Sequence, residues 1–273
     1  MIKFFGRLFN GEASYQVELH AIQLISANGR IPIPTLISHG SLKVDDPDWN
    51  WPYLILQYLD GISIGETWDQ LCIENKMRIA SEMGRTVRFL HSIPLGEGGY
   101  FQMDWDAYRK FLSSQKMNWR KRYQDTGSFP PHFLRQIERF LLPIDDLIDA
   151  NETPHLIHAD LTRDHLLGKI DEGHWITLGV IDFGDSMVGN IFYELVALHL
   201  DLFQCDKNLL KIFLDHYKLK KDLYSNFAIR AMNFTLLHQF GEYIFADLFR
   251  RYPHLCQIET LENLADELWG IDV

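Results

Sequence analysis

Apolar residues follow two different spacings along the chain, first a mixed pattern and then a helical one. Residues 2–5 (IKFF) are a short apolar run typical of a strand. Apolar residues then recur at helical spacing from Val17 to Ile25, behind Ser14, a residue type that caps helices. Residues 52–61 (PYLILQYLDG) are rich in strand formers and end in Asp-Gly. This pattern predicts a small sheet with one helix at the start of the chain.

Beyond residue 61, apolar positions follow mainly the helical period. Two short apolar segments, 155–170 and 174–186, interrupt it and flank a turn at 171–173, which predicts a hairpin. The helices expected from the period are 76–93, 133–149, 191–203, 208–217, 228–249 and 260–269. The sequence therefore predicts an α+β fold, in which a small lobe with a sheet precedes a larger, mainly helical lobe.

The amino-acid composition limits the kinds of molecule that we expect the protein to bind. The 26 Lys and Arg residues against 37 Asp and Glu residues give a formal net charge of −11, which disfavours nucleic-acid binding and favours cationic ligands. Three widely spaced cysteines form no disulfide framework, which is typical of a reducing cytoplasm. The first residues lack the features of a signal peptide, and no apolar run reaches the roughly 20 residues of a membrane helix. We expect a cytoplasmic protein with no membrane or nucleic-acid partner.

The stretch LIHADLTRDHLLG places six polar or ionisable residues between apolar runs. Buried ionisable groups are costly unless they are paired, bind metal or take part in chemistry. His158, Asp160 and His165 could ligate zinc, but the Cys and His spacings of structural zinc sites are absent. A hydrogen-bonded polar turn is the other simple interpretation. This stretch alone favours the polar turn.

A second polar segment, GVIDFGDS, changes this interpretation. Its Asp182 ends an apolar strand about twenty residues after Asp160, and such a carboxylate can bind a hard metal ion at the edge of a cleft. With His165, these two aspartates could converge on one site. Phosphoryl transfer requires this combination, in which one carboxylate orients a hydroxyl and other groups hold a divalent metal against nucleotide phosphates.

The two segments together resemble the aminoglycoside phosphotransferases, which are relatives of protein kinases. H-x-D-x-x-x-x-[NH] followed by I-D-F-G-D is similar to their catalytic and metal-binding loops, and 184–203 resembles the hygromycin-B kinase branch. The resemblance covers about residues 3–249. It implies a bilobal protein-kinase-like fold, with a nucleotide-binding lobe and hinge at 1–61 and a catalytic and acceptor-binding lobe at 62–273. It also implies two strands and a phosphate-covering loop before Lys3, so either these lie upstream of Met1 or the small lobe is truncated.

The resemblance assigns the chemistry to the two loops. It implies that Asp160 is the catalytic residue and that Asp182 and His165 hold Mg²⁺. Position 165 is Asn in most members of the family, and imidazole is a softer ligand than an amide oxygen. His158 is expected to be structural, and Asn190 is given no catalytic role.

The small lobe and the neighbouring strands are expected to bind ATP or GTP. Lys3 matches the lysine that contacts the phosphates, and Glu18 matches its ion-pair partner. Backbone groups of Gln57 and Leu59 are expected to bind the adenine edge. Three apolar side chains are expected to enclose the ring: Leu56, Leu167 and Ile181.

Several carboxylates are candidates for binding the acceptor. They recur at helical spacing or follow the metal-binding loop, and an acidic cleft would suit a cationic or hydroxylated small molecule. These candidates are Asp185, Glu194, Asp201 and Glu242, with Asp247 as a further acidic position.

Three functions remain open at this point. The first is an ATP-dependent O-phosphotransferase acting on a hydroxylated small molecule that is aminoglycoside-like, an activity of the antibiotic-resistance type. The second is a pseudokinase that binds nucleotide with weak or no catalysis, which the missing loop and His165 favour. The third is a metal-dependent hydrolase that uses His158, Asp160, His165 and Asp182.

Overall fold

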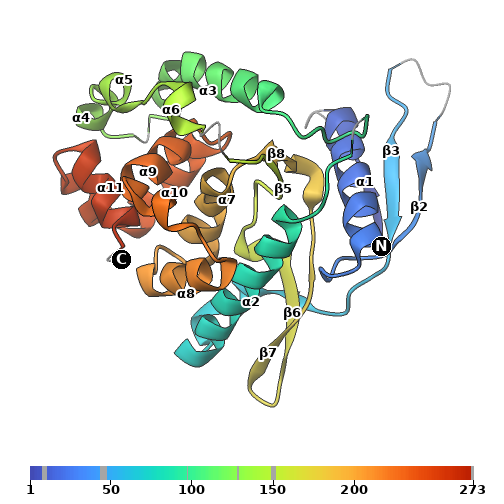
Figure 1. The fold of residues 1–273 in the computed structure, drawn as a ribbon. Helices are drawn as coiled ribbons and strands as arrows, with labels where there is room; N and C mark the ends of the chain where they lie inside the picture. Colours follow the sequence, from blue (N-terminus) through green and yellow to red (C-terminus); the bar gives the residue numbers. More distant parts are fainter. Residues whose placement is uncertain (8–10, 44–47, 97, 128, 149–151, 272–273) are drawn as a thin grey trace.

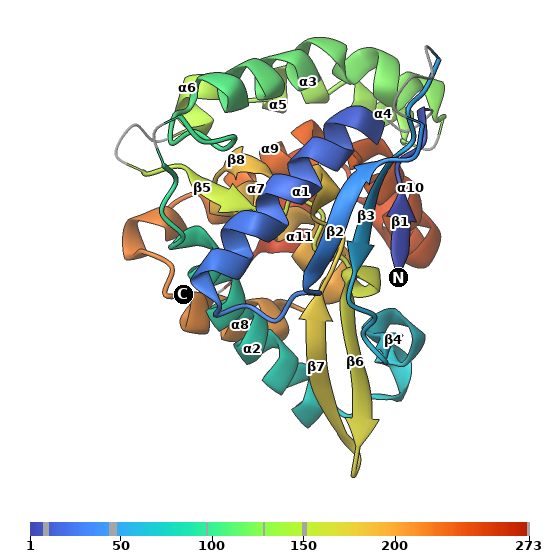
Figure 2. The ribbon, with the colours of Figure 1, turned by 90° about the vertical axis from the view of Figure 1, so that its right-hand side faces the viewer.

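The computed structural model describes all residues except 8–10, 44–47, 97, 128, 149–151 and 272–273. In its first part, the chain forms a three-stranded antiparallel sheet in the order β1-β3-β2, with one helix beside it (Figures 1 and 2). The elements are β1 (Ile2–Phe4), α1 (Gly11–Asn28), β2 (Leu36–Ser41) and β3 (Pro52–Leu56). This is the small sheet with one helix that the pattern predicts.

The first helix begins earlier than predicted. Ser14 lies inside α1 and does not cap it, because the helix already starts at Gly11. A side chain at Gly11 would clash with the backbone carbonyl of Gly6, so only glycine allows this close approach at the start of the helix. The buried face of α1 is apolar apart from Glu18.

The larger part of the chain is mainly helical, as predicted. Two long helices, α2 (Ile73–His91) and α3 (Asp106–Asp125), precede three short ones, α4 (Pro131–Leu134), α5 (Ile137–Phe140) and α6 (Ile144–Leu147). After the strands described below, the remaining helices are α7 (Ile191–Ala197), α8 (Lys207–Tyr217), α9 (Phe227–Leu237), α10 (Gly241–Arg251) and α11 (Leu261–Trp269). The division at residue 61 stays a prediction.

Two predicted helices are wrong in their extent. The segment 133–149 is not one helix but parts of three, and Pro143, which lacks an N–H donor, precedes the last of them; Asp149 lies outside the described residues. The segment 228–249 is divided into α9 and α10 at His238, whose backbone is extended. The ring of His238 donates a hydrogen bond from Nε2 to the Ala159 carbonyl, at 3.0 Å.

The predicted hairpin is present. Strands β6 (Leu166–Asp171) and β7 (His174–Val180) pair in antiparallel register, and Glu172 and Gly173 both have positive φ, which is typical of a type I′ turn. The short strand β4 (Ile62–Ser63) extends this sheet beside β6. Figure 2 shows the hairpin projecting below α1 and the first sheet.

A second small pairing positions the polar loops. Strand β5 (His155–Ile157) pairs with β8 (Met187–Gly189) in antiparallel register. The segment 158–165 leaves β5 toward β6, and the segment 181–186 leaves β7 toward β8. The two polar stretches of the sequence therefore lie side by side, between the hairpin and the β5–β8 pair.

The core lies mainly in the helical part. Every residue of α7 is buried, and all of them except Tyr193 and Glu194 are fully apolar. Helices α2 and α8 pack closely at Gly84, where a side chain would clash with the Phe213 carbonyl. No helix among the residues that the structure describes is long and apolar enough to cross a membrane.

Candidate active site

One end of the site is an ion-pair cluster that joins three distant parts of the chain. Lys3 Nζ on β1 lies 2.6 Å from Glu18 Oε2 on α1 and 2.7 Å from Asp182 Oδ1 after β7. Burial opposes the charge on Lys3, but Glu18 and Asp182 outweigh it and raise the lysine pKa. Burial also opposes the charge on Asp182, but Lys3 and then His165 outweigh it and lower the aspartate pKa. Asp182 is therefore held as a carboxylate.

Backbone geometry aims Asp182 at this cluster. The residue has φ 64° and ψ 64°, in the left-handed region that few residues other than glycine adopt. Aspartate tolerates this region better than most side chains. Such strain concentrates at functional sites, where the surrounding structure enforces it.

His165 joins the two aspartates. Its Nδ1 lies 2.5 Å from the backbone carbonyl of Asp160, an acceptor, so the ring proton is on Nδ1. Nδ1 also lies 3.7 Å from Asp160 Oδ2, and Nε2 lies 3.8 Å from Asp182 Oδ2. When the ring is neutral, this tautomer presents Nε2 as an acceptor to the carboxylate oxygen. A cation between them would satisfy both.

The Asp182 carboxylate suits Mg²⁺ better than the His165 imidazole does. Mg²⁺ binds proteins through one or two carboxylates and takes its other oxygens from water and substrate phosphates, so it does not need a complete protein cage. Among the described residues, no group of three or more His, Cys, Asp and Glu side chains could hold a metal ion alone. That finding gives the zinc-dependent interpretation no support.

Asp160 lies on a loop whose backbone is held by hydrogen bonds with buried side chains. Ala159 has φ 68°, its N–H donates to Glu194 Oε2 at 3.0 Å, and its carbonyl accepts from His238. His158, fully buried, donates from Nε2 to the Ile181 carbonyl at 2.9 Å and so ties the two polar loops together. These contacts agree with the structural role expected for His158.

The environment of Asp160 differs from that of Asp182. Burial raises the pKa of Asp160 to about 6, although His165 opposes the shift, and the nearby carboxylates of Asp185, Asp182 and Asp201 raise it further. A carboxylate with a raised pKa is a better proton acceptor than an ordinary aspartate. Asp160 therefore has the properties of a general base.

A cavity of about 210 Å³ opens beside Asp160. Asp201 lines it and accepts a hydrogen bond from the Arg163 N–H at 2.9 Å. Asp247 lines it as well and pairs with Arg251 at 2.6 Å. The sequence analysis missed Tyr243, an exposed aromatic residue of this cavity. Tyr243 lies four residues before Asp247 and eight before Arg251 on α10, so the three residues share one face of the helix. This spacing is the feature of the sequence that could have identified Tyr243.

The other acidic candidates are not at the surface of this cavity. Glu194 is completely buried under the loop that carries Asp160. Glu242 on α10 accepts hydrogen bonds at Oε2 from Nε and from one terminal nitrogen of Arg122. Helical spacing places these carboxylates inward, where the Ala159 N–H donates to Glu194 Oε2 and Arg122 binds Glu242. Glu194 Oε1 has no hydrogen-bond partner among the described residues. Asp185 follows Asp182 in the same loop and accepts from Gln239 Nε2 at 3.0 Å.

The residues expected to bind adenine directly follow β3. The Gln57 N–H donates to the Thr35 carbonyl at 2.8 Å, and the Leu59 carbonyl accepts from the Gly61 N–H at 3.0 Å. The backbone hydrogen bonds among the described residues do not use the Gln57 carbonyl or the Leu59 N–H, so one acceptor and one donor remain there. Adenine binding at this strand stays a prediction.

The predicted apolar floor lies beside that strand. Leu56 is buried at the end of β3, and Leu167 pairs with Gly179 in the hairpin. The Ile181 N–H donates to the His165 carbonyl at 3.0 Å, which places its half-buried side chain next to the metal-binding candidates.

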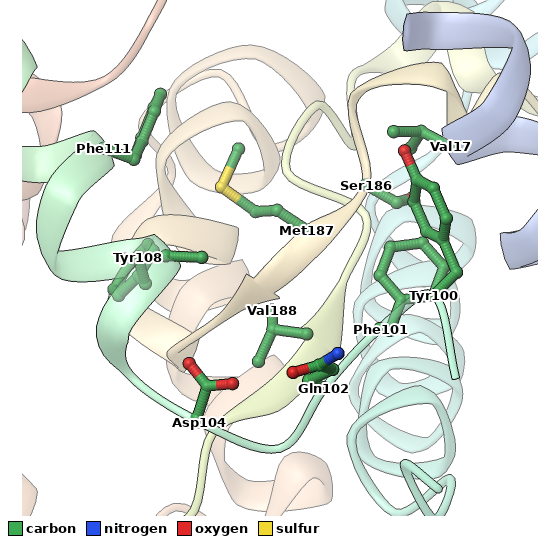
Figure 3. Close-up of a pocket in the computed structure, with 11 residues that line it drawn as sticks. Val17, Tyr100, Phe101, Gln102, Asp104, Tyr108, Phe111, Ser186, Met187 and Val188 are labelled. Carbon is green, nitrogen blue, oxygen red and sulfur yellow. The ribbon is translucent and has the colours of Figure 1, made fainter. Parts of the chain in front are cut away.

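A larger, mainly apolar cavity of about 360 Å³ lies between α1, α3 and β8. Figure 3 shows its side chains, which come from Val17 on α1, from Tyr108 and Phe111 on α3, and from the segment after Asp185. No pattern in the sequence predicts this cavity, because its lining comes from three separate segments, at residues 17, 100–111 and 186–188.

Comparisons with known proteins show the family and the fold. The model of the phosphotransferase enzyme family (APH) matches residues 3–228. The chain belongs to this family. Its arrangement of a small sheet region and a mainly helical remainder is the protein-kinase-like fold of the family.

Solved structures with this fold include several family members. The GDP complex of aminoglycoside 2'-phosphotransferase-IIIa has a TM-score of 0.63 and 19% identity, with 93% of this chain and 82% of that one covered. The streptomycin–ATP complex of APH(2")-IIa gives 0.59 and 18%, covering 98% and 86%. A microcompartment-associated aminopropanol kinase gives 0.61 and 16%, covering 99% and 87%.

A curated relative is much longer than this chain. The lysine-specific demethylase JMJ21 of Arabidopsis thaliana is 22% identical over 276 residues, which cover 81% of this chain. The match spans only 29% of that protein.

Proposed function

We propose that the protein is a Mg²⁺-requiring O-phosphotransferase that uses ATP or GTP to phosphorylate a hydroxylated, cationic small molecule. The observation that carries the proposal is the position of His165 between Asp160 and Asp182, 3.7 Å and 3.8 Å from the two carboxylates. A proton acceptor and a metal-binding carboxylate then lie on either side of one side chain. Phosphoryl transfer uses these two groups together.

Each residue has a defined part in this proposal. Asp160 orients the acceptor hydroxyl and accepts its proton, and its pKa of about 6 suits that task near neutral pH. Asp182 and His165 hold Mg²⁺, which supplies neutralisation of phosphate charge when it is bound. Lys3 provides a positive charge for the phosphates, and Glu18 keeps it in place. Catalysis comes mainly from positioning and electrostatic stabilisation.

The acceptor would enter the cavity beside Asp160. Its carboxylates, Asp201 and Asp247, and the exposed ring of Tyr243 suit an amine that also carries a hydroxyl group. Solved family members bind aminoglycosides or are named for aminopropanol, which supports this class of substrate. An aminoglycoside acceptor, the hygromycin-B kinase branch, antibiotic resistance and a cytoplasmic location remain parts of the proposal.

A second function, nucleotide binding without transfer, is favoured by one observation. The ammonium group of Lys3 is bound by two carboxylates, so a nucleotide phosphate must compete with Asp182 for it. A protein in which this competition fails would bind nucleotide weakly and catalyse no transfer.

Two measurements on the wild-type protein separate these functions. Thermal stability is measured with ATP or GTP, each with and without Mg²⁺, and labelled γ-phosphate transfer is measured to hygromycin B, streptomycin and aminopropanol. We expect stabilisation that requires both nucleotide and Mg²⁺, and transfer to at least one acceptor. Stabilisation without transfer to any acceptor supports the second function. No stabilisation by either nucleotide contradicts both.

A further inference from the structure

A basic cavity of about 220 Å³ lies where α2, α8 and β5 meet. It shares no lining residue with the cavity that contains Asp160. Figure 1 shows α2 and α8 side by side on the helical side of the molecule. The residues that define the basic cavity are Arg88, His91, His155, Lys218 and Lys220.

The charge of this cavity is opposite to that of the whole chain. Three of its side chains are cationic, in a chain whose formal net charge is −11. Its one carboxylate, Glu152, lies 3.5 Å from Arg230 and is partly neutralised there. The ends of α2 and α8 add only about half a negative charge each, which does not cancel three full positive charges.

His91 supplies a buried donor to the same cavity. Its side chain is 7% exposed, and its Nε2 has no hydrogen-bond partner among the described residues. Nδ1 lies 2.9 Å from the Tyr217 hydroxyl, and the described hydrogen bonds give that hydroxyl no other acceptor. We assign the hydroxyl as the donor to Nδ1, which places the ring proton on Nε2. A buried N–H without a partner is uncommon and calls for an acceptor.

Burial and ring stacking determine the protonation and the orientation of the His91 ring. Burial, with a smaller effect of His155, lowers the pKa of His91 well below its usual range, so the ring is neutral and carries one proton. The His155 ring stacks on the His91 ring, with centroids 5.1 Å apart and nearly parallel planes. The stacking holds the His91 ring in one orientation.

We propose that the basic cavity binds the phosphate group of a small anionic ligand. The His91 Nε2–H donates one hydrogen bond, and the guanidinium of Arg88 and the ammonium groups of Lys218 and Lys220 provide the charge. A phosphate carries enough oxygens to accept from several of these groups at once. The cavity is smaller than a typical site for a drug-sized ligand, which suits a compact oxyanion.

The test uses inorganic phosphate as the probe and histidine resonances as the readout. Phosphate is titrated into ¹⁵N-histidine-labelled full-length protein at constant ionic strength, with malonate and chloride in parallel titrations. We expect saturable shifts of the His91 and His155 resonances with phosphate. Shifts of His158 and His165 would report separately on phosphate at the candidate active site. Malonate binding as tight as phosphate binding would show a carboxylate site and overturn the assignment to phosphate.

Neighbouring lysines provide a matched pair of variants. Lys220→Gln removes one cation of the cavity and is expected to weaken phosphate binding roughly tenfold, as expected for a charge-assisted hydrogen bond. Lys221→Gln removes the same charge from an exposed residue that does not line the cavity, and we expect it to bind phosphate like wild type. Equal weakening by both would show general electrostatic attraction and overturn the proposal.

His91→Phe tests the donor itself. Phenylalanine keeps a ring against His155 and Tyr217 but has no N–H, so the His155 shift with phosphate is expected to disappear. If this variant does not fold, the lysine pair still decides the matter. An absence of saturable shifts in the wild-type protein would overturn the proposal without affecting the proposed kinase activity.

Discussion

The two ends of the candidate active site contain the same kind of group in opposite electrostatic settings. At the end next to the small sheet, Asp182 lies 2.7 Å from the ammonium of Lys3, and its pKa is lowered. At the acceptor end, Asp160 faces carboxylates and the pKa rises to about 6. The side chain of Asp182 is 43% exposed and that of Asp160 is 19% exposed, so burial opposes the charged form more strongly at Asp160. Lys3 acts in the same direction, because it lowers the pKa of Asp182.

This contrast assigns different chemistry to the two aspartates. When neighbouring acids have pKa values pushed apart, the group that stays ionised suits charge binding, and the group near neutral pH suits proton transfer. Asp182 then corresponds to the metal and phosphate end, and Asp160 to the acceptor end. His165, which lies between them, contacts both.

The largest expected loss follows from removing Asp182. Asp182→Ala deletes the carboxylate at the metal end, so Mg²⁺-dependent stabilisation by ATP and phosphate transfer should both disappear. The fold should persist, because Glu18 still pairs with Lys3 at 2.6 Å. Thermal shifts with ATP and Mg²⁺ measure the first effect and a labelled-phosphate assay the second.

Asp215→Ala is the matched control for that variant. Asp215 is exposed on α8 and lines none of the cavities described above, so its removal should leave nucleotide binding and transfer unchanged. Full stabilisation of Asp182→Ala by ATP with Mg²⁺ would remove Asp182 from the metal site.

The next largest effect concerns Asp160. Asp160→Asn keeps the size of the side chain and removes its charge, so transfer should fall by at least about a hundredfold, the lower range for a positioned general base. Nucleotide affinity should change little, because Asp160 lies at the acceptor end. Measuring kcat and the nucleotide Kd separately in Asp182→Ala and Asp160→Asn distinguishes the roles of the two aspartates. If Asp160→Asn is as active as wild type, Asp160 is not the base.

Local chemistry explains what the sequence predicts well. The turn at 171–173 is specified by its own residues, because Gly173 adopts positive φ without strain and the flanking segments alternate as strands do. The segments that carry Asp160 and Asp182 are recognisable because polar residues interrupt apolar runs. Their convergence follows once two strands, β5 and β8, pair.

Distant contacts explain what the sequence predicts poorly. The break between α9 and α10 depends on a hydrogen bond from His238 to the Ala159 carbonyl, 79 residues away. Helix α3 has mostly polar residues, and its buried positions are visible only after it packs on α9, β8 and α6. Glu194 and Glu242 were candidates for the surface because helical spacing does not tell which face is covered.

Substitution of Lys3 tests its contribution to the pKa difference between Asp160 and Asp182. Lys3→Met removes the charge that lowers the pKa of Asp182, so the ATP KM should rise or kcat should fall, by about tenfold for the loss of one strong charge interaction. Glu18→Gln should have a milder effect, because Lys3 keeps Asp182 as a partner. Steady-state kinetics over a range of ATP concentrations measure both. Unchanged kinetics in both variants would mean that the β1 lysine does not contact the phosphates.

The pH dependence of activity tests the acceptor end. Asp160 must be ionised to accept a proton, and its pKa is raised to about 6. We expect kcat/KM to fall about tenfold per pH unit below that value and to level off above it. In Asp160→Asn the residual activity should lose this dependence. An unchanged acid limb in the variant would assign the titration to another group.

The smallest expected effect concerns the stability of the loop beneath Asp160. Burial raises the pKa of Glu194 from 4.5 to about 7, so the folded state holds this proton more tightly than the unfolded state. The stability from that proton is fully present below pH 4.5 and is lost as the pH rises through about 7. Glu194→Gln cannot ionise, and its amide oxygen can still accept from the Ala159 N–H.

The readout is the change of Tm with pH rather than Tm itself, because the buried amide nitrogen adds its own fixed cost. We expect the Tm of wild type to fall relative to that of Glu194→Gln as the pH rises from about 5 to about 8, by a few degrees if roughly 1 kcal/mol is involved. Parallel Tm curves over this range would show that Glu194 does not titrate there. Its role would then be only to hold the Ala159 peptide in its left-handed conformation below Asp160.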